Sequence, residues 1–200
     1  MAGPPARLVL ASRSPQRRAI LETLGVPFRV RPADIPERTR GEPREVAGEN
    51  ALRKARAVAA GETGGLVLGV DTLVALGREI YGKPVDAAAA GMTLRALSGA
   101  RHTVWSGLAL LEAGGGDGVG EGAEPRLAVV ATAVRFRPLD EASIAWYVAG
   151  GEWRGRAGGY AIQGRGAALV EAIDGDYTNV VGLPVAALLR LWPQMLGGAV

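Results

Sequence analysis

Cysteine is absent from the 200-residue sequence, and histidine occurs once, as His102. Disulfides, thiolate nucleophiles, zinc sites built from cysteine and metal sites that need several histidines are therefore excluded. A Ser-His-Asp triad would have to use His102, and a lone histidine that leads into a strand is more often structural than catalytic. Any metal ion must be held by oxygen atoms of Asp and Glu, which favours Mg²⁺ or Mn²⁺.

Long apolar runs and a large charge excess are absent as well. No stretch reaches the length of a membrane span, and no signal-peptide core precedes the first predicted strand, so we expect a cytoplasmic protein with no membrane partner. The net charge is +3, the Lys and Arg residues are dispersed, and aromatic residues make up 5% of the chain. These features argue against a nucleic-acid partner, whereas a small anionic ligand is compatible with them.

Apolar patterning predicts an α/β fold. Hydrophobic residues make up 48% of the chain, which is enough for the core of one domain over residues 1–200. Predicted strands and helices alternate, which indicates a mixed sheet with flanking helices, and a glycine-rich acidic segment at about 113–125 predicts a flexible loop in a long hairpin. We expect strands at 7–11, 28–30, 66–70, 72–76, 102–112, 127–136 and 167–173, and helices at 15–24, 45–60, 86–97, 139–148 and 183–191.

The stretch from Asp71 to Lys83 places an acid and a base close together in the sequence. An apolar run ends at Asp71, which predicts a carboxylate at the end of a buried strand, and such a group is costly unless it is ligated, paired or used. Lys83 lies between Gly82 and Pro84, on backbone that we expect to be stiff and sharply turned. This combination suits a phosphate-cleaving site, but a hairpin in which Asp71 merely caps a turn explains the segment equally well.

Residues 12–18 have the features of an anion site at a helix start. Ser14 is a suitable N-cap and Pro15 suits the first helical position. Free backbone N–H groups, the serine hydroxyls and the Arg17 guanidinium would all donate to a phosphate. The alternative is an ordinary capped helix with arginines on its solvated face; the segment lacks the glycine-lysine pattern of a P-loop.

Three further segments carry polar groups that bear on function. Lys54 falls close to the apolar face of its predicted helix, so its ammonium group either extends to solvent or points into a charged pocket. The glycines of residues 156–166 permit close approach to a ligand, and Gln163 offers a donor and an acceptor to a nucleobase edge, although a turn between lobes is the alternative. Residues 174–176, Asp-Gly-Asp, are more typical of an Asx-type turn than of a metal site.

Taken together, seven segments in this order resemble the Maf family, the septum-formation-inhibitor-like nucleotide pyrophosphatases. They span nearly the whole chain, and their joint occurrence is far more specific than any one of them. The segments are Leu10-Ala11-Ser12-x-Ser14-Pro15-x-Arg17-Arg18, Lys54-Ala55-x-Ala57, Asp71-Thr72-x-Val74, Gly82-Lys83-Pro84-x-Asp86, Leu97-Ser98-Gly99-x-x-His102, Ala157-Gly158-x-Tyr160-x-Ile162-Gln163-Gly164 and Asn179-Val180-Val181-Gly182-Leu183-Pro184.

The resemblance implies an inosine-triphosphatase-like α/β fold with two lobes around a central cleft. It also implies hydrolysis of a nucleoside triphosphate to the monophosphate and pyrophosphate, with a divalent cation, Mg²⁺ or Mn²⁺. Asp71 matches the catalytic aspartate, which either takes the proton of the attacking water or holds the metal that acidifies it, and Glu37 matches an acidic position that could help to hold the metal. Phosphate handling falls to Ser14, Arg17, Lys54 and the catalytic Lys83, with Ser12 added by its hydroxyl.

Three positions bear on the choice of base. Members that act on dTTP and UTP carry arginine, threonine and glutamine where this chain has Gln16, Thr72 and Gln163, whereas the 7-methyl-GTP type carries an aromatic residue, glutamine and glutamate. The chain thus resembles the pyrimidine type at two of three positions, which predicts dTTP and UTP, with modified pyrimidine nucleotides as further candidates. A second departure is Gly155-Arg156, where many members have Asp-Lys, so the charge is kept without the lysine geometry.

Other functions remain open from the sequence. They are a non-enzymatic nucleotide- or nucleic-acid-binding protein acting on cell division, a Maf-type pyrophosphatase with another base preference such as 7-methyl-GTP, and a phosphomonoesterase. A homodimer is compatible with the sequence, which does not fix the oligomeric state. Trp146, Trp153 and Trp192 are expected either at an interface or in the core.

Overall fold

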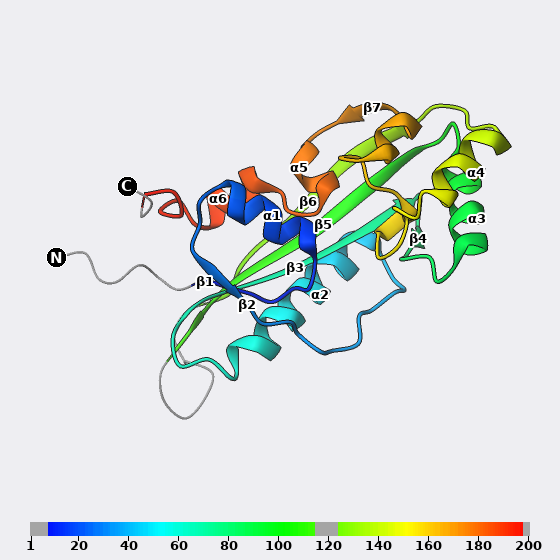
Figure 1. The fold of residues 1–200 in the computed structure, drawn as a ribbon. Coiled ribbons are helices and arrows are strands. Elements are labelled where there is room, and N and C mark those ends of the chain that lie inside the picture. The colour runs from blue at the N-terminus through cyan, green and yellow to red at the C-terminus, as the bar shows by residue number, and fades with distance from the viewer. Residues whose placement is uncertain (1–7, 115–123, 198–200) are drawn as a thin grey trace.

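A mixed sheet of seven strands forms the centre of the computed structural model, which describes residues 8–114 and 124–197 (Figure 1). The strand order is β2-β1-β3-β5-β6-β7, and β4 pairs with β3. β1 pairs in parallel with β2 and β3, whereas the other pairings are antiparallel. The strands are β1 Leu8–Leu10, β2 Phe28–Val30, β3 Gly65–Leu76, β4 Glu79–Tyr81, β5 Arg101–Ala113, β6 Arg126–Phe136 and β7 Val170–Asp174.

Helices lie against both faces of this sheet, which confirms the predicted fold class (Figure 1). α2 covers one face, and α1 and α6 cover the other at the end of the sheet where β1 and β2 lie. No helix in the described ranges is long and apolar enough to cross a membrane. The helices are α1 Pro15–Thr23, α2 Pro43–Ala59, α3 Ala87–Leu97, α4 Glu141–Ala149, α5 Tyr177–Val181 and α6 Val185–Leu191, with 3₁₀ turns η1 Ala157–Gly159 and η2 Arg165–Leu169.

Two predictions about elements were wrong, and one strand and one helix were not predicted. β3 is one strand of 12 residues, so Asp71 lies inside it and not at its end, because β5 pairs with it without interruption from Gly65 to Ala75. The last strand begins only at Val170, because η2 occupies the residues before it. The strand and the helix that the sequence did not predict are β4 and α5. The flexible loop predicted at about 113–125 falls mostly outside the described residues, since 115–123 are not described.

Small residues bring α2 unusually close to the sheet. A Cβ atom on Gly69 of β3 would lie 2.2 Å from the carbonyl oxygen of Ala51, and one on Gly107 of β5 would lie 2.1 Å from that of Ala47. Both distances are far below van der Waals contact, so only glycine fits at these two positions. The close approach sets the depth at which polar side chains of α2 reach β3.

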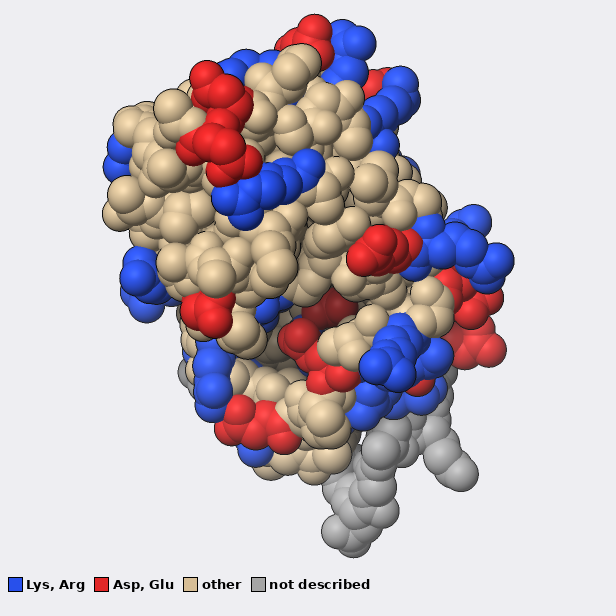
Figure 2. Space-filling view, turned by 90° about the vertical axis from the view of Figure 1, so that its right-hand side faces the viewer, with Lys and Arg blue, Asp and Glu red and all other residues tan. Residues whose placement is uncertain are grey.

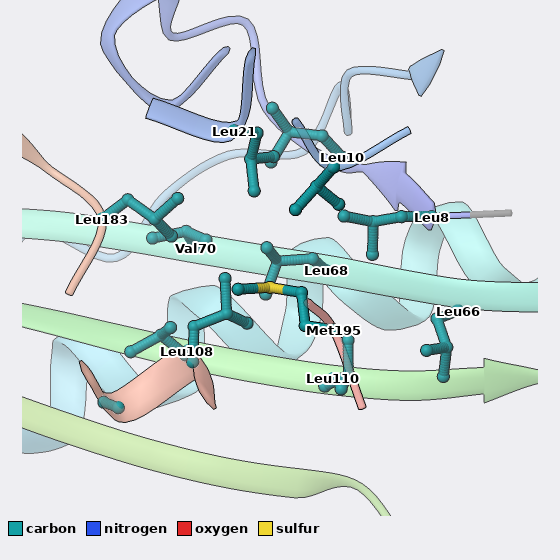
Figure 3. Packing of buried hydrophobic residues seen from close by; sticks show 13 residues of the cluster. Leu8, Leu10, Leu21, Leu66, Leu68, Val70, Leu108, Leu110, Leu183 and Met195 are labelled. Atoms are coloured by element: carbon teal, nitrogen blue, oxygen red, sulfur yellow. The ribbon is translucent and has the colours of Figure 1, made fainter. Parts of the chain in front are cut away.

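Two apolar clusters stabilise the same face of the sheet at its two ends. One joins leucines of β1, β3 and β5 to Leu21 of α1, Leu183 and Met195, as Figure 3 shows. The other joins α3 and α4 to the far halves of β3, β5 and β6, around Phe136 and Tyr147. Trp153 belongs to this second core, whereas Trp146 is 45% exposed and carries the Arg165 guanidinium over its ring.

His102 is part of the second core and has no catalytic partner there. It is 1% exposed, its Nε2 lies 2.9 Å from the Tyr160 hydroxyl, and its ring meets Phe136 edge-on. Its Nδ1 has no hydrogen-bond partner among the described residues. Burial lowers the pKa of His102 to about 4, so the folded protein holds the imidazole neutral. This agrees with the structural role predicted for a lone histidine.

Acid should therefore destabilise the fold through His102. Between pH ~6.5 and ~4 the unfolded chain binds a proton that the folded chain does not. The contribution of His102 to the free energy of unfolding is therefore complete above the unfolded pKa. It is lost as the pH is lowered, by about 3 kcal/mol over this window. Chemical denaturation at several pH values measures this loss. His102→Gln should flatten the profile by the same amount, and equal slopes for the two proteins would contradict the assignment.

Candidate active site

A cleft of about 610 Å³ opens where one edge of β3 has no strand beside it. β1 pairs with Leu66–Leu68 of β3 and β4 pairs with Val74–Leu76, so residues 69–73 lie between the two pairings. Successive residues of a strand point to opposite faces, and at this uncovered stretch both Asp71 and Thr72 line the cleft. Figure 2 shows a hollowed face with acidic side chains in its depth and basic side chains around it.

Every residue that the sequence predicted for the site lies on the wall of this cleft. They come from the start of α1, the loop before α2, α2 itself, β3, the segment after β4 and the segment after η1. The residues are Ser12, Ser14, Gln16, Arg17, Glu37, Lys54, Asp71, Thr72, Lys83 and Gln163. The structure therefore brings the predicted residues together around one cleft.

Lys54 joins the two carboxylates of the cleft. Its Nζ lies 2.6 Å from Asp71 Oδ1 and 2.5 Å from Glu37 Oε1. The side chains of Lys54 and Asp71 are 9% and 8% exposed, so this pair is buried, whereas Glu37 is 40% exposed. Of the two alternatives for Lys54, the charged pocket is the one that the structure has. Removing one member of such a buried pair is strongly destabilising, because it leaves a charge without compensation.

Surrounding cations determine the protonation of Glu37. Its burial acts to raise the pKa, but the hydrogen bond and charge of Lys54, together with the charges of Lys83 and Arg17, outweigh this and lower the pKa of Glu37. The carboxylate is thus held ionised and faces the cleft. An ionised carboxylate beside Asp71 is a ligand of the kind that Mg²⁺ and Mn²⁺ prefer.

Arg17 is buried and connects three parts of the site. Its guanidinium donates to Ser12 Oγ at 2.7 Å, to Thr72 Oγ1 at 3.0 Å and to the carbonyl oxygen of Gly182 at 2.9 Å. Burial lowers its pKa, although Asp71 and Glu37 act to raise it. Arg17 therefore holds the two hydroxyls in place, and a phosphate would meet a guanidinium whose orientation is already fixed.

The start of α1 has the geometry predicted for it. Ser14 caps the helix and Pro15 occupies the first turn. The backbone N–H of Ser14 donates to Ser12 Oγ at 3.3 Å, and the Ser14 hydroxyl donates to Gln16 Oε1 at 3.1 Å. The helix N-terminus thus faces the cleft together with the hydroxyls of the two serines that precede it, which is a favourable arrangement for an anion.

Glycines of the segment around η1 hold it against the turn that carries Lys83. The N–H of Gly158 donates to the carbonyl oxygen of Gly82 at 3.1 Å. Gly158 has φ +67°, and a Cβ there would lie 2.7 Å from Val74, so the position requires glycine. Gln163 follows on the wall of the cleft and is exposed. The functional interpretation of this glycine-rich segment fits its place beside the cleft.

Positive charge exceeds negative charge on the cleft wall. Six cationic side chains and three carboxylates line it. Arg156, which stands where many Maf members have lysine, is one of the cations, and its Nε is buried without a hydrogen-bond partner in the described part of the chain. The cations are Arg13, Arg17, Lys54, Lys83, Arg154 and Arg156, and the carboxylates are Asp34, Glu37 and Asp71. This balance suits a polyanionic ligand.

The two carboxylates of the cleft fit a divalent cation whose other ligands are phosphate oxygens and water. Residues 8–114 and 124–197 contain no group of three or more His, Asp and Glu side chains placed to hold a metal by themselves. Glu37 and Asp71 nevertheless supply two carboxylates joined by one lysine. Mg²⁺ is commonly bound by one or two carboxylates together with phosphate oxygens and water. The Asp174-Gly175-Asp176 turn contributes nothing to this set, since Asp176 caps α5 as expected of an Asx-type turn.

Two buried polar residues of the site were missed by the sequence reasoning. Asn50 of α2 is 2% exposed and donates to Asp71 Oδ2 at 3.0 Å. Ser106 of β5 is fully buried, and its hydroxyl lies 2.8 Å from Thr72 Oγ1. The four-residue spacing of Asn50 and Lys54 on one helix could have indicated the first. Ser106 depends on the pairing of β3 with β5, which no local pattern reveals.

Residues 7–195 match the model of the family described as Maf-like protein. The chain is also similar to curated proteins named dTTP/UTP pyrophosphatase. It is 42% identical to one from Symbiobacterium thermophilum, over 96% of this chain and 98% of that protein. Identity is 47% with one from Gloeobacter violaceus, over 92% and 94% of the two chains, and 49% with one from Moorella thermoacetica, over 93% of each.

Proposed function

The chain belongs to the Maf family, and from this membership and the cleft we propose that it is a nucleoside triphosphate pyrophosphatase that hydrolyses dTTP and UTP to the monophosphate and pyrophosphate. The printed names of its relatives support the reaction and the pyrimidine bases. One observation of the structure carries most weight, namely that Lys54 holds two carboxylates together in a cleft otherwise rich in cations. A simple anion-binding module has no need of the carboxylates.

We assign the triphosphate to the end of the cleft formed by α1, α2 and the turn after β4. Ser12 and Ser14 offer hydroxyls at the helix N-terminus, and Arg17 offers a guanidinium fixed by three hydrogen bonds. Lys54, which is bonded to Glu37, and Lys83, whose charge also acts on Glu37, add ammonium groups. Cations fixed in this way stabilise the charge that develops on the phosphate oxygens without reorganising during the reaction.

Asp71 is assigned to the attacking water. It either accepts the proton of the water or serves with Glu37 as a ligand of Mg²⁺ or Mn²⁺, and such a metal, when bound, would neutralise phosphate charge and acidify water. Hydrogen bonds from Lys54 and Asn50 fix the carboxylate in either role. The water oxygen forms a bond to the α-phosphorus. The bond between the α-phosphorus and the oxygen that bridges it to the β-phosphorus breaks, and pyrophosphate leaves.

Base preference is assigned to Thr72 and Gln163, whereas Gln16, the third position that distinguishes the types, lies elsewhere in the cleft. Thr72 is held by Arg17 and Ser106, whereas the exposed Gln163 can present its amide to a base edge that carries both a donor and an acceptor. Uracil and thymine carry such an edge, and modified pyrimidines that keep it are further candidate substrates. Gln16 bonds to Ser14 at the helix start, so this departure from the pyrimidine type bears on the cleft end that we assign to phosphate.

A triphosphate panel tests the proposed function. We expect pyrophosphate from dTTP and UTP with Mg²⁺ or Mn²⁺, and a kcat/KM for these two nucleotides at least about tenfold above that for GTP, because the two-ring guanine differs in size and shape from the single pyrimidine ring that the site is proposed to accept. Product identification by anion exchange distinguishes the alternatives. Orthophosphate would indicate a phosphomonoesterase, and a higher kcat/KM for 7-methyl-GTP would overturn the base assignment.

Gln163→Glu provides the matched variant for this panel. The substitution keeps the size of the side chain and removes its donor, so we expect kcat/KM for dTTP and UTP to fall while the thermal unfolding midpoint stays unchanged.

Salt-sensitive RNA or DNA binding without any pyrophosphate release would favour the non-enzymatic alternative instead.

Two further expectations belong to this proposal. A cytoplasmic location suits an enzyme that acts on free nucleotides, and the cysteine-free composition supports it. A homodimer is supported by the partly exposed Trp146, since aromatic residues are enriched in protein interfaces. Light scattering on the purified protein measures the oligomeric state directly.

A further inference from the structure

We propose that Asn50 is a positioning residue of the active site, whose amide holds the Asp71 carboxylate and the loop of Glu37 in one fixed arrangement. The inference rests on the proposed function, because it assigns a purpose to Asn50 only if Asp71 and Glu37 act on substrate. None of the family motifs identified in the sequence includes this residue.

The Asn50 amide uses both of its ends. Its Oδ1 accepts the backbone N–H of Arg38 at 2.8 Å, and its Nδ2 donates to the carbonyl oxygen of Arg38 at 2.9 Å. The same Nδ2 donates to Asp71 Oδ2 at 3.0 Å. Arg38 directly follows Glu37 in the chain. One buried side chain thus fixes the backbone beside one carboxylate and bonds directly to the other.

The two oxygens of Asp71 are bound by different residues of one helix. Lys54 bonds to Oδ1 and Asn50 bonds to Oδ2, and the two residues are four positions apart on α2, so they share a face of the helix. The close packing of α2 on Gly69 and Gly107 sets the distance from which both reach β3. With both oxygens bound, the carboxylate plane cannot rotate freely, and its remaining lone pairs keep one direction.

Asparagine is the residue type that this arrangement requires. An apolar side chain would leave the Arg38 N–H, its carbonyl oxygen and Asp71 Oδ2 without partners. Aspartate would keep the acceptor for the Arg38 N–H but would lose both donated hydrogen bonds and place a second negative charge against Asp71. Asn50→Ala therefore removes all three hydrogen bonds of the Asn50 side chain, whereas Asn50→Asp removes only the two that it donates.

A purely structural role is the alternative, in which Asn50 only anchors the loop. Both roles lower stability when Asn50 is removed, so stability cannot separate them. They differ in the turnover of the folded protein. A positioning role predicts a loss of kcat at nearly unchanged affinity for an unreactive nucleotide, since the phosphate-binding groups of α1 and Lys83 stay in place.

The experiment compares wild type, Asn50→Ala, Asn50→Asp and Val58→Ala as full-length proteins. Val58 is 2% exposed on the same helix and does not line the cleft, so Val58→Ala controls for lost packing in α2. The measurements are the unfolding midpoint, kcat and KM for pyrophosphate release from dTTP, and the Kd of the unreactive analogue α,β-imido-dUTP. Assays are run well below the lowest midpoint.

We expect kcat to fall about 10- to 100-fold in Asn50→Ala, with a larger loss in Asn50→Asp and a Kd for the analogue within about threefold of wild type. Val58→Ala should keep the wild-type kcat. Wild-type kcat in folded Asn50→Ala, or a kcat loss no larger than in Val58→Ala, would overturn the inference while the proposed function stands. Absence of pyrophosphate release from the wild-type protein with any triphosphate would overturn both.

Discussion

Asp71→Asn is expected to lower kcat for pyrophosphate release from dTTP by about 10²- to 10⁴-fold, the range typical of removing a general base or its equivalent. The substitution is isosteric, and Lys54 keeps Glu37 as a counter-charge, so the variant should still fold, although loss of the buried ion pair should lower its unfolding midpoint. Steady-state kinetics with a coupled pyrophosphate assay measures the effect. Circular dichroism and the unfolding midpoint establish that the variant is folded.

Asp174→Asn is the matched control for this experiment. Asp174 is likewise an aspartate on a strand, but it pairs with Arg101 at the exposed end of β7 and does not line the cleft. Its replacement should leave kcat within about twofold of wild type, since exposed ion pairs contribute little. Comparable rates for Asp71→Asn and Asp174→Asn would show that the cleft has been assigned the wrong acid.

Metal titration of Asp71→Asn separates the two roles left open for Asp71. If the carboxylate mainly holds the metal, a higher Mg²⁺ or Mn²⁺ concentration should restore part of the lost kcat, because the weakened site can be filled by mass action. If the carboxylate mainly accepts the proton of the attacking water, saturating metal should restore nothing. Both outcomes keep Asp71 in the site and differ only in its role.

The fold could largely be predicted from apolar periodicity, because β5, β6, α2 and α3 are long and well delimited. The error at Asp71 shows the limit of that reasoning. An apolar run that stops at a carboxylate looks like the end of a strand, yet β3 continues, since β5 satisfies its backbone and Lys54 and Asn50 satisfy the carboxylate. Both compensating contacts come from distant parts of the sequence.

The members of the site could be named from motifs, but their connections could not. The sequence placed Arg17 and Thr72 in one site by resemblance. It did not indicate that Arg17 would be buried and bonded to Thr72, or that Ser106 would bond to the same Thr72 hydroxyl. These contacts depend on the register of β3 with β5 and on the packing of α1. The contacts of Asp71 depend instead on how closely α2 packs on Gly69 and Gly107, and the need for glycine at these two positions is visible only once the helix is in place.

Lys83 and Lys54 illustrate two different uses of a lysine in one cleft. Lys54 is buried between two carboxylates, so its removal would disturb stability and catalysis together. Lys83 is exposed on the cleft wall and forms no ion pair within 4.0 Å among residues 8–114 and 124–197. Its turn is nevertheless fixed, because Gly158 bonds to Gly82 and Gly159 packs on Pro84. Lys83 is therefore a cation held ready for a ligand.

Lys83→Ala should consequently lower kcat/KM for dTTP by about 10²- to 10³-fold, the usual loss on removing one fixed charge or donor from a transition state, without a change in the unfolding midpoint. Most of the loss should fall on kcat, because the charge on the phosphate oxygens grows as pyrophosphate leaves. Lys83→Arg should recover part of the rate, since it restores the charge but not the geometry of the ammonium group.

Arg78→Ala controls for the loss of a cation from the same hairpin. Arg78 follows β3, is highly exposed and does not line the cleft, so its removal should leave the rate unchanged. A loss confined to KM in Lys83→Ala would mean that Lys83 binds the ground state and the transition state equally well. A rate equal to that of Arg78→Ala would remove Lys83 from the mechanism. The triphosphate would then be held by Arg17, Lys54 and the start of α1, and the Gly82-Lys83-Pro84 turn would serve the fold alone.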